Sequence, residues 1–215
     1  EDLYKKVMKD LEAKGIHSYK YTDLDEKNKA FVDKIYTDQI EPILAPQIIN
    51  SFHPFPFIEN KNIYIICELD SDGEYNLGLL PIPYALPEYY MLSDKTWIRT
   101  ESILKAKVDK VFSFYKVKKS YIMNLHRNMD LNYEDHREDE ATDYKMQMKK
   151  LLKKRTRLQV LRVNTDGPLE KATKEFLKDR LNIKDHQFFT YTSPFNMGYV
   201  FKLENNLKSV CDPNL

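Results

Sequence analysis

The scarcity of glycine and cysteine excludes several kinds of binding site. The 215 residues include only five glycines, and none of them forms a GxGxxG or Walker pattern, so a glycine-rich phosphate loop is excluded. Two cysteines, Cys67 and Cys211, are too few for a disulfide framework or a zinc ribbon. Cys67 lies in an apolar run, and we expect it to be a small core residue. The five histidines include no pair at i, i+4 around a glutamate, which excludes the zinc-protease helix motif.

An excess of one charge is also lacking. Lys and Arg number 34 and Asp and Glu 33, so the formal net charge is +1. The 15 tyrosines are scattered and do not form the basic, aromatic pattern that stacks nucleobases. We therefore expect no nucleic-acid partner, and any anionic ligand must be held by a local patch.

Long apolar runs are absent as well. No stretch reaches the ~18 apolar residues of a membrane span, and no secretory signal opens the chain. With so little cysteine, this composition predicts a cytoplasmic protein without a membrane span. The first residue, Glu1, already lies in a helical pattern, so we interpret the chain as a domain of a longer protein.

The residues that are present predict a folded domain. Hydrophobic residues make up 42% of the chain and charged residues 31%, which is typical of a globular protein. We predict one α+β domain with a central mixed, largely antiparallel sheet covered by helices. Strands are expected at 63–69, 77–82, 89–92, around Trp97, and at 121–125, 160–163 and 187–191. Helices are expected at 3–11, 24–35, 100–112, 144–152 and from Gly167-Pro168 to 177, with 194–203 undecided.

Two local signals fix the ends of these elements. The turn at 70–74 joins the first two strands as an antiparallel hairpin. Thr22 with Asp25 resembles a capping box, and the helix that it opens must end before Pro42.

His126, Arg127 and Asn128 follow one another at the end of a predicted strand. An arginine fork, an amide donor and a histidine could together grip a phosphate. The alternative is a polar transition from strand to loop, with Asn128 as a turn residue.

A second arginine group stands where the basic stretch 145–157 runs into the next strand. Arg155, Arg157 and Arg162 could bind a polyanion, or they could pair with carboxylates inside the protein. The basic stretch itself is typical of a solvated helix face, neutralised by the acidic loop before it.

The segment His53-Pro54-Phe55-Pro56-Phe57 predicts a rigid loop packed by aromatic rings, because two prolines exclude a regular helix or a central strand. His53 could donate or bind a phosphate or act as a general base. It could equally be a structural histidine that bonds the loop backbone.

This segment carries a resemblance to a known family. The run at 40–46, the His-Pro-Phe-Pro-Phe element and Asn60 resemble the bacterial long-chain polyphosphate kinases. The resemblance continues in order through 97–117, 126–131, 153–163 and 167–183, and covers about residues 15–207. It implies the middle, or head, domain of such an enzyme over 1–215. Residues 1–15 would then lead in from an N-terminal domain, and 208–215 would begin the connection to C-terminal domains.

The family transfers the terminal phosphate of ATP reversibly to inorganic polyphosphate through a phosphohistidine. The resemblance places that histidine, Mg²⁺ and the main ATP contacts in other domains, so it implies no catalytic residue, metal ligand or cofactor here, and an inactive isolated fragment. Its partners would be the other domains of the polypeptide, inorganic polyphosphate and a second subunit. The parent enzyme would be cytoplasmic, and the resemblance is also compatible with its peripheral association with a membrane. The head domain would frame the active-site tunnel, make dimer contacts, or do both.

The chain departs from the family pattern at Ala45, Glu88 and Asn164, where the family usually has Thr, Arg and Glu, and at His126, where the family prefers Thr. Two other interpretations stay open: a structural or dimerisation module without substrate contact, and a stand-alone phosphate-binding domain of the same fold. The residues expected to face phosphate are Arg127, Asn128, Arg155, Arg157 and Arg162.

Overall fold

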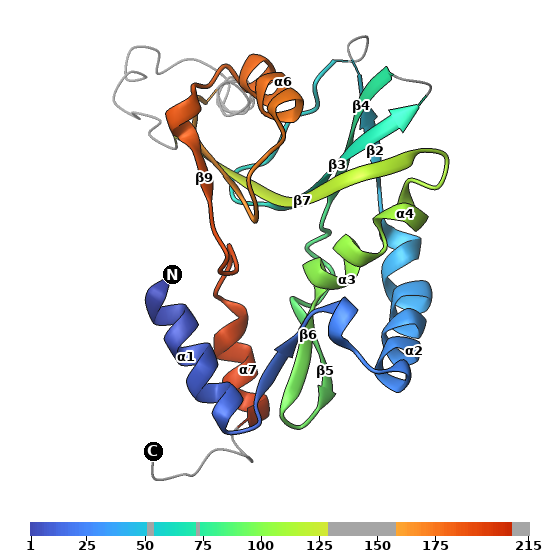
Figure 1. Ribbon diagram of the computed structural model, residues 1–215, viewed down its shortest axis with the longest axis vertical. Helices are drawn as coiled ribbons and strands as arrows, with labels where there is room; N and C mark the ends of the chain where they lie inside the picture. Colours follow the sequence, from blue (N-terminus) through green and yellow to red (C-terminus); the bar gives the residue numbers. More distant parts are fainter. Residues whose placement is uncertain (51–53, 72–73, 129–157, 208–215) are drawn as a thin grey trace, which may run out of the picture.

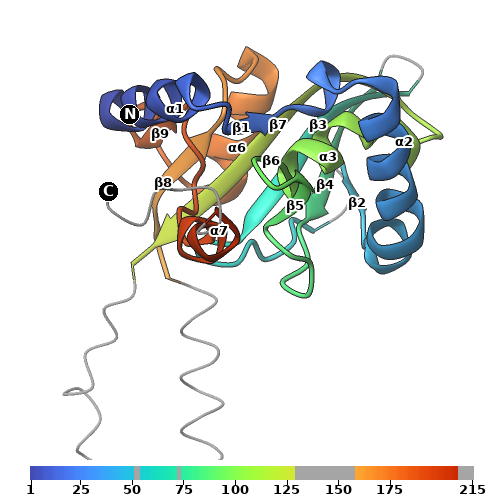
Figure 2. The same cartoon turned by 90° about the horizontal axis from the view of Figure 1, so that it is seen from below.

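The computed structural model describes residues 1–50, 54–71, 74–128 and 158–207 (Figures 1 and 2). The described chain forms an α+β domain with two sheets, and α-helices pack against both. Figure 1 shows the larger sheet in the upper part of the molecule and the smaller sheet below it. The predicted α+β class is therefore confirmed, and the smaller sheet is a feature that the sequence did not reveal.

The larger sheet is mixed but mostly antiparallel, as predicted. Only its last two neighbouring strands within the described residues run parallel. In spatial order its strands are β2 (Gln47–Ile49), β4 (Glu74–Pro81), β3 (Ile63–Ser71), β7 (Lys116–Arg127), β8 (Val160–Thr165) and β9 (Phe188–Thr190). The predicted hairpin is formed by β3 and β4.

The smaller sheet joins residues from the start of the chain to a later hairpin. Its order is β1 (His17–Tyr19), β6 (Thr96–Arg99) and β5 (Tyr89–Ser93). β1 is parallel to β6, and β5 is antiparallel to it. The α-helices are α1 (Asp2–Ala13), α2 (Glu26–Ile35), α3 (Thr100–Ala106), α4 (Val108–Val111), α6 (Lys171–Leu181) and α7 (Tyr199–Leu207). Shorter helical turns are η1 (Tyr21–Asp23), η2 (Tyr36–Ile40), η3 (Glu41–Ile43) and η5 (Asp185–Gln187).

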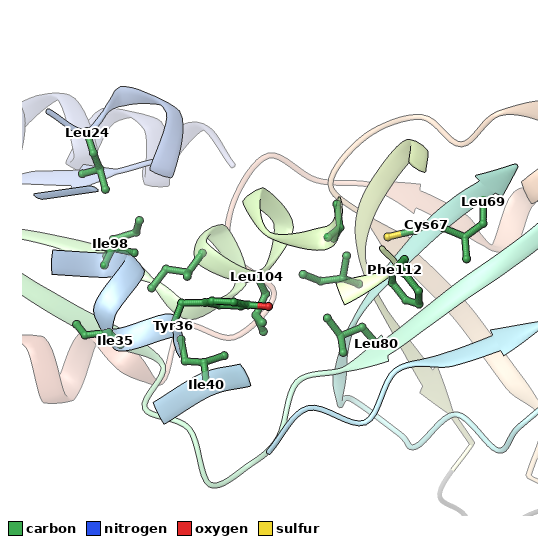
Figure 3. Packing of buried hydrophobic residues seen from close by; sticks show 14 residues of the cluster. Leu24, Ile35, Tyr36, Ile40, Cys67, Leu69, Leu80, Ile98, Leu104 and Phe112 are labelled. Atoms are coloured by element: carbon green, nitrogen blue, oxygen red, sulfur yellow. The ribbon is translucent and has the colours of Figure 1, made fainter. Parts of the chain in front are cut away.

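Three clusters of buried side chains hold these layers together. The first lies between α2, α3, α4 and the larger sheet, where the Tyr36 ring packs beside Ile40 and Leu104 (Figure 3). The second packs the opposite face of the larger sheet against α6. The third joins α1 and α7 to the smaller sheet around Trp97, which is fully buried. Because β3 is covered on both faces, its run of apolar residues needs no alternation with polar ones.

Glycine is required at one point in the sheet. A Cβ atom built on Gly78 of β4 would lie 2.8 Å from Cζ of Phe112 and 3.1 Å from Cδ1 of Leu69. The Phe112 ring therefore packs directly against the backbone of β4, which brings α4 close to the sheet.

Some local predictions were wrong. The N-cap of α2 is Asp25, whose side chain accepts a hydrogen bond from the backbone N–H of Asn28 at 2.8 Å, and Thr22 lies in the preceding turn η1. Asp25 is the N-cap because it stands three residues before a helix N–H that has no partner within the helix. The helix expected from Gly167-Pro168 begins at Lys171 instead.

Other predictions were resolved by the structure. The undecided segment 194–203 contains the start of helix α7. The helix expected at 144–152 lies outside the described residues. No helix among the described residues is long and apolar enough to cross a membrane.

Candidate functional site

The residues expected to face phosphate are only partly covered by the structure. Arg155, Arg157 and His53 lie outside the described residues. Arg127 ends β7, Asn128 follows it, and Arg162 lies in β8. Pro54 to Phe57 form an irregular segment in which Phe55 packs against Phe176 of α6, with ring centroids 6.2 Å apart.

Arg127 is bonded to the backbone around it. Its Nε donates to the carbonyl oxygen of Ile58 at 3.1 Å, and its Nη1 donates to that of Leu158 at 2.8 Å. The guanidinium lies 4.7 Å from the centroid of the Phe57 ring. Burial lowers the pKa of Arg127, although the side chain stays charged at neutral pH. Among the described residues Nη2 alone has no hydrogen-bond partner, so most of this fork holds the segment 57–58 and Leu158 against β7.

His126 is not brought together with Arg127. The β7–β8 register shifts at this point, because His126 pairs with Arg162 of β8 and Arg127 pairs with Val160, which leaves Leu161 of β8 as the extra residue. Because side chains alternate along a strand, His126 shares its face with Asn124, while Arg127 turns toward residues 57–58. The predicted trio is therefore divided, and the neighbour of His126 is Arg162.

His126 lines a pocket of about 430 Å³. Its walls come from the turn before β3, from residues 82–88, from the start of α3 and from the start of α7. A volume of this size is within the range of small-ligand sites. The chain therefore builds the pocket from segments that are far apart in the sequence.

A second pocket of about 460 Å³ adjoins the first. Ile63, Arg99, Glu101 and Phe195 line both pockets. The second extends past α3 toward Lys20. We call the two together the sheet-face groove.

The carboxylates of the sheet-face groove are all neutralised by cations of the groove. Glu88 accepts from Nζ of Lys202 at 3.0 Å and also from Asn196. Glu101, which is 8% exposed, is bonded to Arg99. Asp166 binds Nζ of Lys105 at 2.5 Å. These three pairs leave little negative charge to repel an anion.

Lys61 and His126 line the first pocket, and Arg162 lies opposite His126 on β8. We call Lys61, His126 and Arg162 the basic corner. Within the part of the chain that the structure describes, none of the three has an ion-pair partner. Burial lowers the pKa of His126, and the positive charges of Arg162 and Lys61 lower it further. His126 is therefore mostly neutral at neutral pH.

Two buried asparagines lie beside the basic corner on the same sheet face. Asn124 and Asn164 face each other across β7 and β8, and each is only 3% exposed. Nδ2 of Asn164 donates to Oδ1 of Asn124 at 2.7 Å. Among the described residues, Oδ1 of Asn164 has no hydrogen-bond donor. A buried amide oxygen without a donor is uncommon and calls for an explanation.

Cys67, the cysteine among the described residues, lies outside the sheet-face groove. Cys67 is fully buried, and that burial raises the pKa of its thiol to about 12. Such a thiol is a poor nucleophile. In the described ranges, no three His, Cys, Asp or Glu side chains gather closely enough to hold a metal ion. The arrangement is suited to holding charge in place.

Lys61 was missed by sequence reasoning. It has a positive φ of 63°, and its backbone N–H donates to the carbonyl oxygen of Leu125 at 2.8 Å. The signal was the run Asn60-Lys61-Asn62, because two asparagines suggest a tight turn. What the sequence could not give was the place of this turn beside the end of β7.

Comparisons with known proteins agree on one family. A family model described as the polyphosphate kinase middle domain matches residues 27–203. Polyphosphate kinase from Campylobacter jejuni is 25% identical over 209 residues, which are 96% of this chain and 30% of the relative. The Lactiplantibacillus plantarum protein of the same name is 29% identical over 198 residues, 90% of this chain and 27% of the relative. The crystal structure of polyphosphate kinase from Porphyromonas gingivalis superposes with a TM-score of 0.67 at 20% identity, over 99% of this chain and 30% of that one.

The chain thus spans less than a third of the length of these relatives. Three of its departures from the family pattern lie at the sheet-face groove. Glu88 and His126 line the first pocket, and Asn164 is bonded to Asn124, which lines it too. Ala45 is exposed outside the groove. With an amide at position 164, the basic corner has no carboxylate beside it on β8.

Proposed function

Because the chain belongs to the polyphosphate kinase family, as its middle domain, we propose that it is a non-catalytic part of an enzyme that moves phosphate between ATP and polyphosphate. The reaction is the reversible transfer of the terminal phosphate of ATP to inorganic polyphosphate, through a phosphohistidine outside this chain. The observation that carries the proposal is the match of the middle-domain model to residues 27–203.

The physical chemistry of the reaction is consistent with a non-catalytic domain that supplies positive charge while other domains carry the catalytic groups. Phosphoryl transfer between polyanions depends on positioning and on stabilisation of negative charge. The described residues supply cations on a rigid sheet and supply no gathered metal ligands. We propose that other domains of the enzyme bind the Mg²⁺ and ATP that the parent reaction requires.

Within this proposal, the domain frames the path of the polymer or contacts a second subunit, or does both. Arg162, opposite His126 on β8, is a proposed phosphate contact beside the sheet-face groove. Asn128, Arg155 and Arg157 remain proposed phosphate contacts near it in the sequence. Arg127 can contribute through Nη2, since its Nε and Nη1 are bonded to carbonyl oxygens.

A purely structural or dimerisation role is the second candidate, and the bonding of Arg127 favours it. A guanidinium that joins β7 to residues 57–58 and Leu158 acts as a scaffold group. Under that role, replacing the arginines would lower stability or dimerisation and leave polyphosphate affinity unchanged.

The position of the phosphohistidine tests the proposal. The complete gene product that carries this chain is incubated with Mg²⁺ and ATP labelled in the terminal phosphate, and the labelled peptide is identified. We expect a phosphohistidine outside these 215 residues and no label on the purified 215-residue chain. Label on a histidine of this chain, or polyphosphate made by the chain alone, would refute the non-catalytic role.

A further inference from the structure

We propose that Lys61, His126 and Arg162, the basic corner, form a binding site for a phosphate-type oxyanion at one end of the sheet-face groove. The proposal deepens the proposed function, and rests on it only for the source of the ligand. The same three side chains would bind any ligand that presents a phosphate group.

His126 and Arg162 lie side by side in the larger sheet. The two residues are directly opposite each other on β7 and β8. Like charges at such a position destabilise a sheet, because their Cβ atoms lie about 4.5–5.5 Å apart. When His126 is protonated, a bound anion beside the pair would offset that repulsion, and no carboxylate within the described residues pairs with either side chain.

Lys61 adds a third cation by way of an unusual backbone conformation. Its φ of 63° is in the left-handed region that lysine seldom adopts. The bond from its N–H to Leu125 fixes the turn against β7, only one residue from His126. Strained backbone is concentrated at binding and catalytic sites, because the surrounding structure must hold it. The lowering of the His126 pKa by the Lys61 charge agrees with a short separation between the two groups.

Positive side chains outnumber carboxylates in the lining of the groove, which independently favours an anionic ligand. Its lining contains five cationic side chains, Lys20, Lys61, Arg99, Lys105 and Lys202, and three carboxylates. The three carboxylates form ion pairs with Arg99, Lys105 and Lys202. The remaining positive charge, with Arg162 beside the groove, has no partner within the described chain. A concave surface with this excess concentrates anions.

His126 should make binding depend on pH. The groups that face it are Arg162 from β8 and Lys61 from the turn before β3. Across the pocket, Glu88 is already held by Lys202, and Glu101 by Arg99. A bound phosphate would favour the protonated imidazole, so affinity should rise as the pH falls below about 6.5. In the empty site His126 gains its proton at a lower pH than an ordinary histidine.

The test is a titration of the purified 215-residue chain with long-chain polyphosphate, orthophosphate and ATP as separate probes. Each titration is run at about 50 and 200 mM KCl, a range over which phosphate contacts weaken strongly, and at a pH above and a pH below the ordinary histidine pKa of about 6.5. The variants are Lys61→Gln, Arg162→Gln and His126→Gln. Lys27→Gln, an exposed lysine on α2 away from the groove, is the matched control for loss of one charge.

We expect Lys61→Gln and Arg162→Gln to weaken binding about tenfold at low salt, because each removes a charge-assisted hydrogen bond. The salt dependence should decrease by about one counterion for each variant. His126→Gln should keep the affinity at the higher pH and lose the rise at the lower pH. The probe that binds most tightly identifies the source of the phosphate.

Two results would overturn the proposal: no binding of any probe by the wild-type chain at low salt, or variants no weaker than the Lys27→Gln control. If a variant does not fold, NMR titration of the His126 imidazole in the wild-type chain replaces it. That resonance must shift on addition of phosphate, and its pKa must rise. Failure of this site leaves the proposed function intact if the complete gene product still makes polyphosphate. If the chain binds phosphate but the complete gene product makes no polyphosphate, the binding site stands and the proposed function is refuted.

Discussion

Replacing Arg127 with glutamine should destabilise the domain much more than replacing Arg162. The two arginines lie at the same end of the β7–β8 pair, yet their surroundings differ. Arg127 donates to the carbonyl oxygens of Ile58 and Leu158 and stacks on Phe57, whereas Arg162 has no ion-pair partner within the described residues. Arg127 therefore holds backbone segments together, whereas we propose Arg162 as a contact to a ligand.

The size of the effect follows from these contacts. A hydrogen bond from a charged donor contributes about 1.5–3 kcal/mol, and an exposed cation–π contact contributes about 0.5–1 kcal/mol. Because Arg127 is half-buried and glutamine can keep one bond, we expect a net loss of about 2–3 kcal/mol. At about 2–4 °C per kcal/mol for a chain of this size, the Tm should fall by about 4–12 °C. Arg162→Gln should change the free energy of unfolding by less than about 0.5 kcal/mol.

The assay is thermal and urea unfolding of both variants beside the wild-type chain, with a polyphosphate titration of each folded protein. The expected pattern is a lowered Tm with little loss of affinity for Arg127→Gln, and the opposite for Arg162→Gln. If Arg127→Gln unfolds at the wild-type temperature and loses polyphosphate binding, the assignment of Arg127 to the scaffold is refuted.

Four further predictions concern stability and reactivity. Gly78→Ala should lower stability by about 1–3 kcal/mol in urea unfolding, because the new methyl group would contact the Phe112 ring at 2.8 Å; an unchanged midpoint would contradict this packing. Asp25→Ala should cost about 1 kcal/mol in the same assay through loss of the α2 N-cap, and Asp25→Asn much less. Cys67 should resist thiol reagents at mildly alkaline pH in the native protein and react on unfolding, because burial raises its pKa to about 12; rapid native labelling would disprove the burial. Two lysines of α6 lower the pKa of Asp185 to about 2, so their pairing should stabilise the fold above about pH 4 and be lost as the pH falls to about 2; Asp185→Asn should therefore lose less stability over that interval than the wild type.

The fold could be predicted where local chemistry decides the structure. The β3–β4 hairpin follows from two apolar runs and a turn of Asp, Ser and Gly residues between them. α1 ends at Ala13 as its apolar spacing predicts, with Gly15 at φ 77°. Helix starts were harder, since two candidate caps, Thr22 and Asp25, stand close together and only one meets a free N–H in the folded chain.

The site could not be predicted in the same way, because contacts between distant segments create it. The sequence shows His126 beside Arg127, but their side chains lie on opposite faces of β7, and the β7–β8 register places Arg162 opposite His126. Lys61 joins them only because its turn is bonded to Leu125. Strand register across a long connection depends on the packing of the whole sheet, which a single sequence does not state. The family itself could be recognised, because its short motif at 53–57 and the order of the later segments are local features.

The most direct test of the central claim is polyphosphate synthesis by the complete gene product with Mg²⁺ and ATP, assayed beside the 215-residue chain at equal concentration. We expect polyphosphate from the complete protein and none from the chain alone. If the complete protein makes no polyphosphate from ATP and transfers no phosphate from polyphosphate to ADP, the chain is not the middle domain of a working polyphosphate kinase.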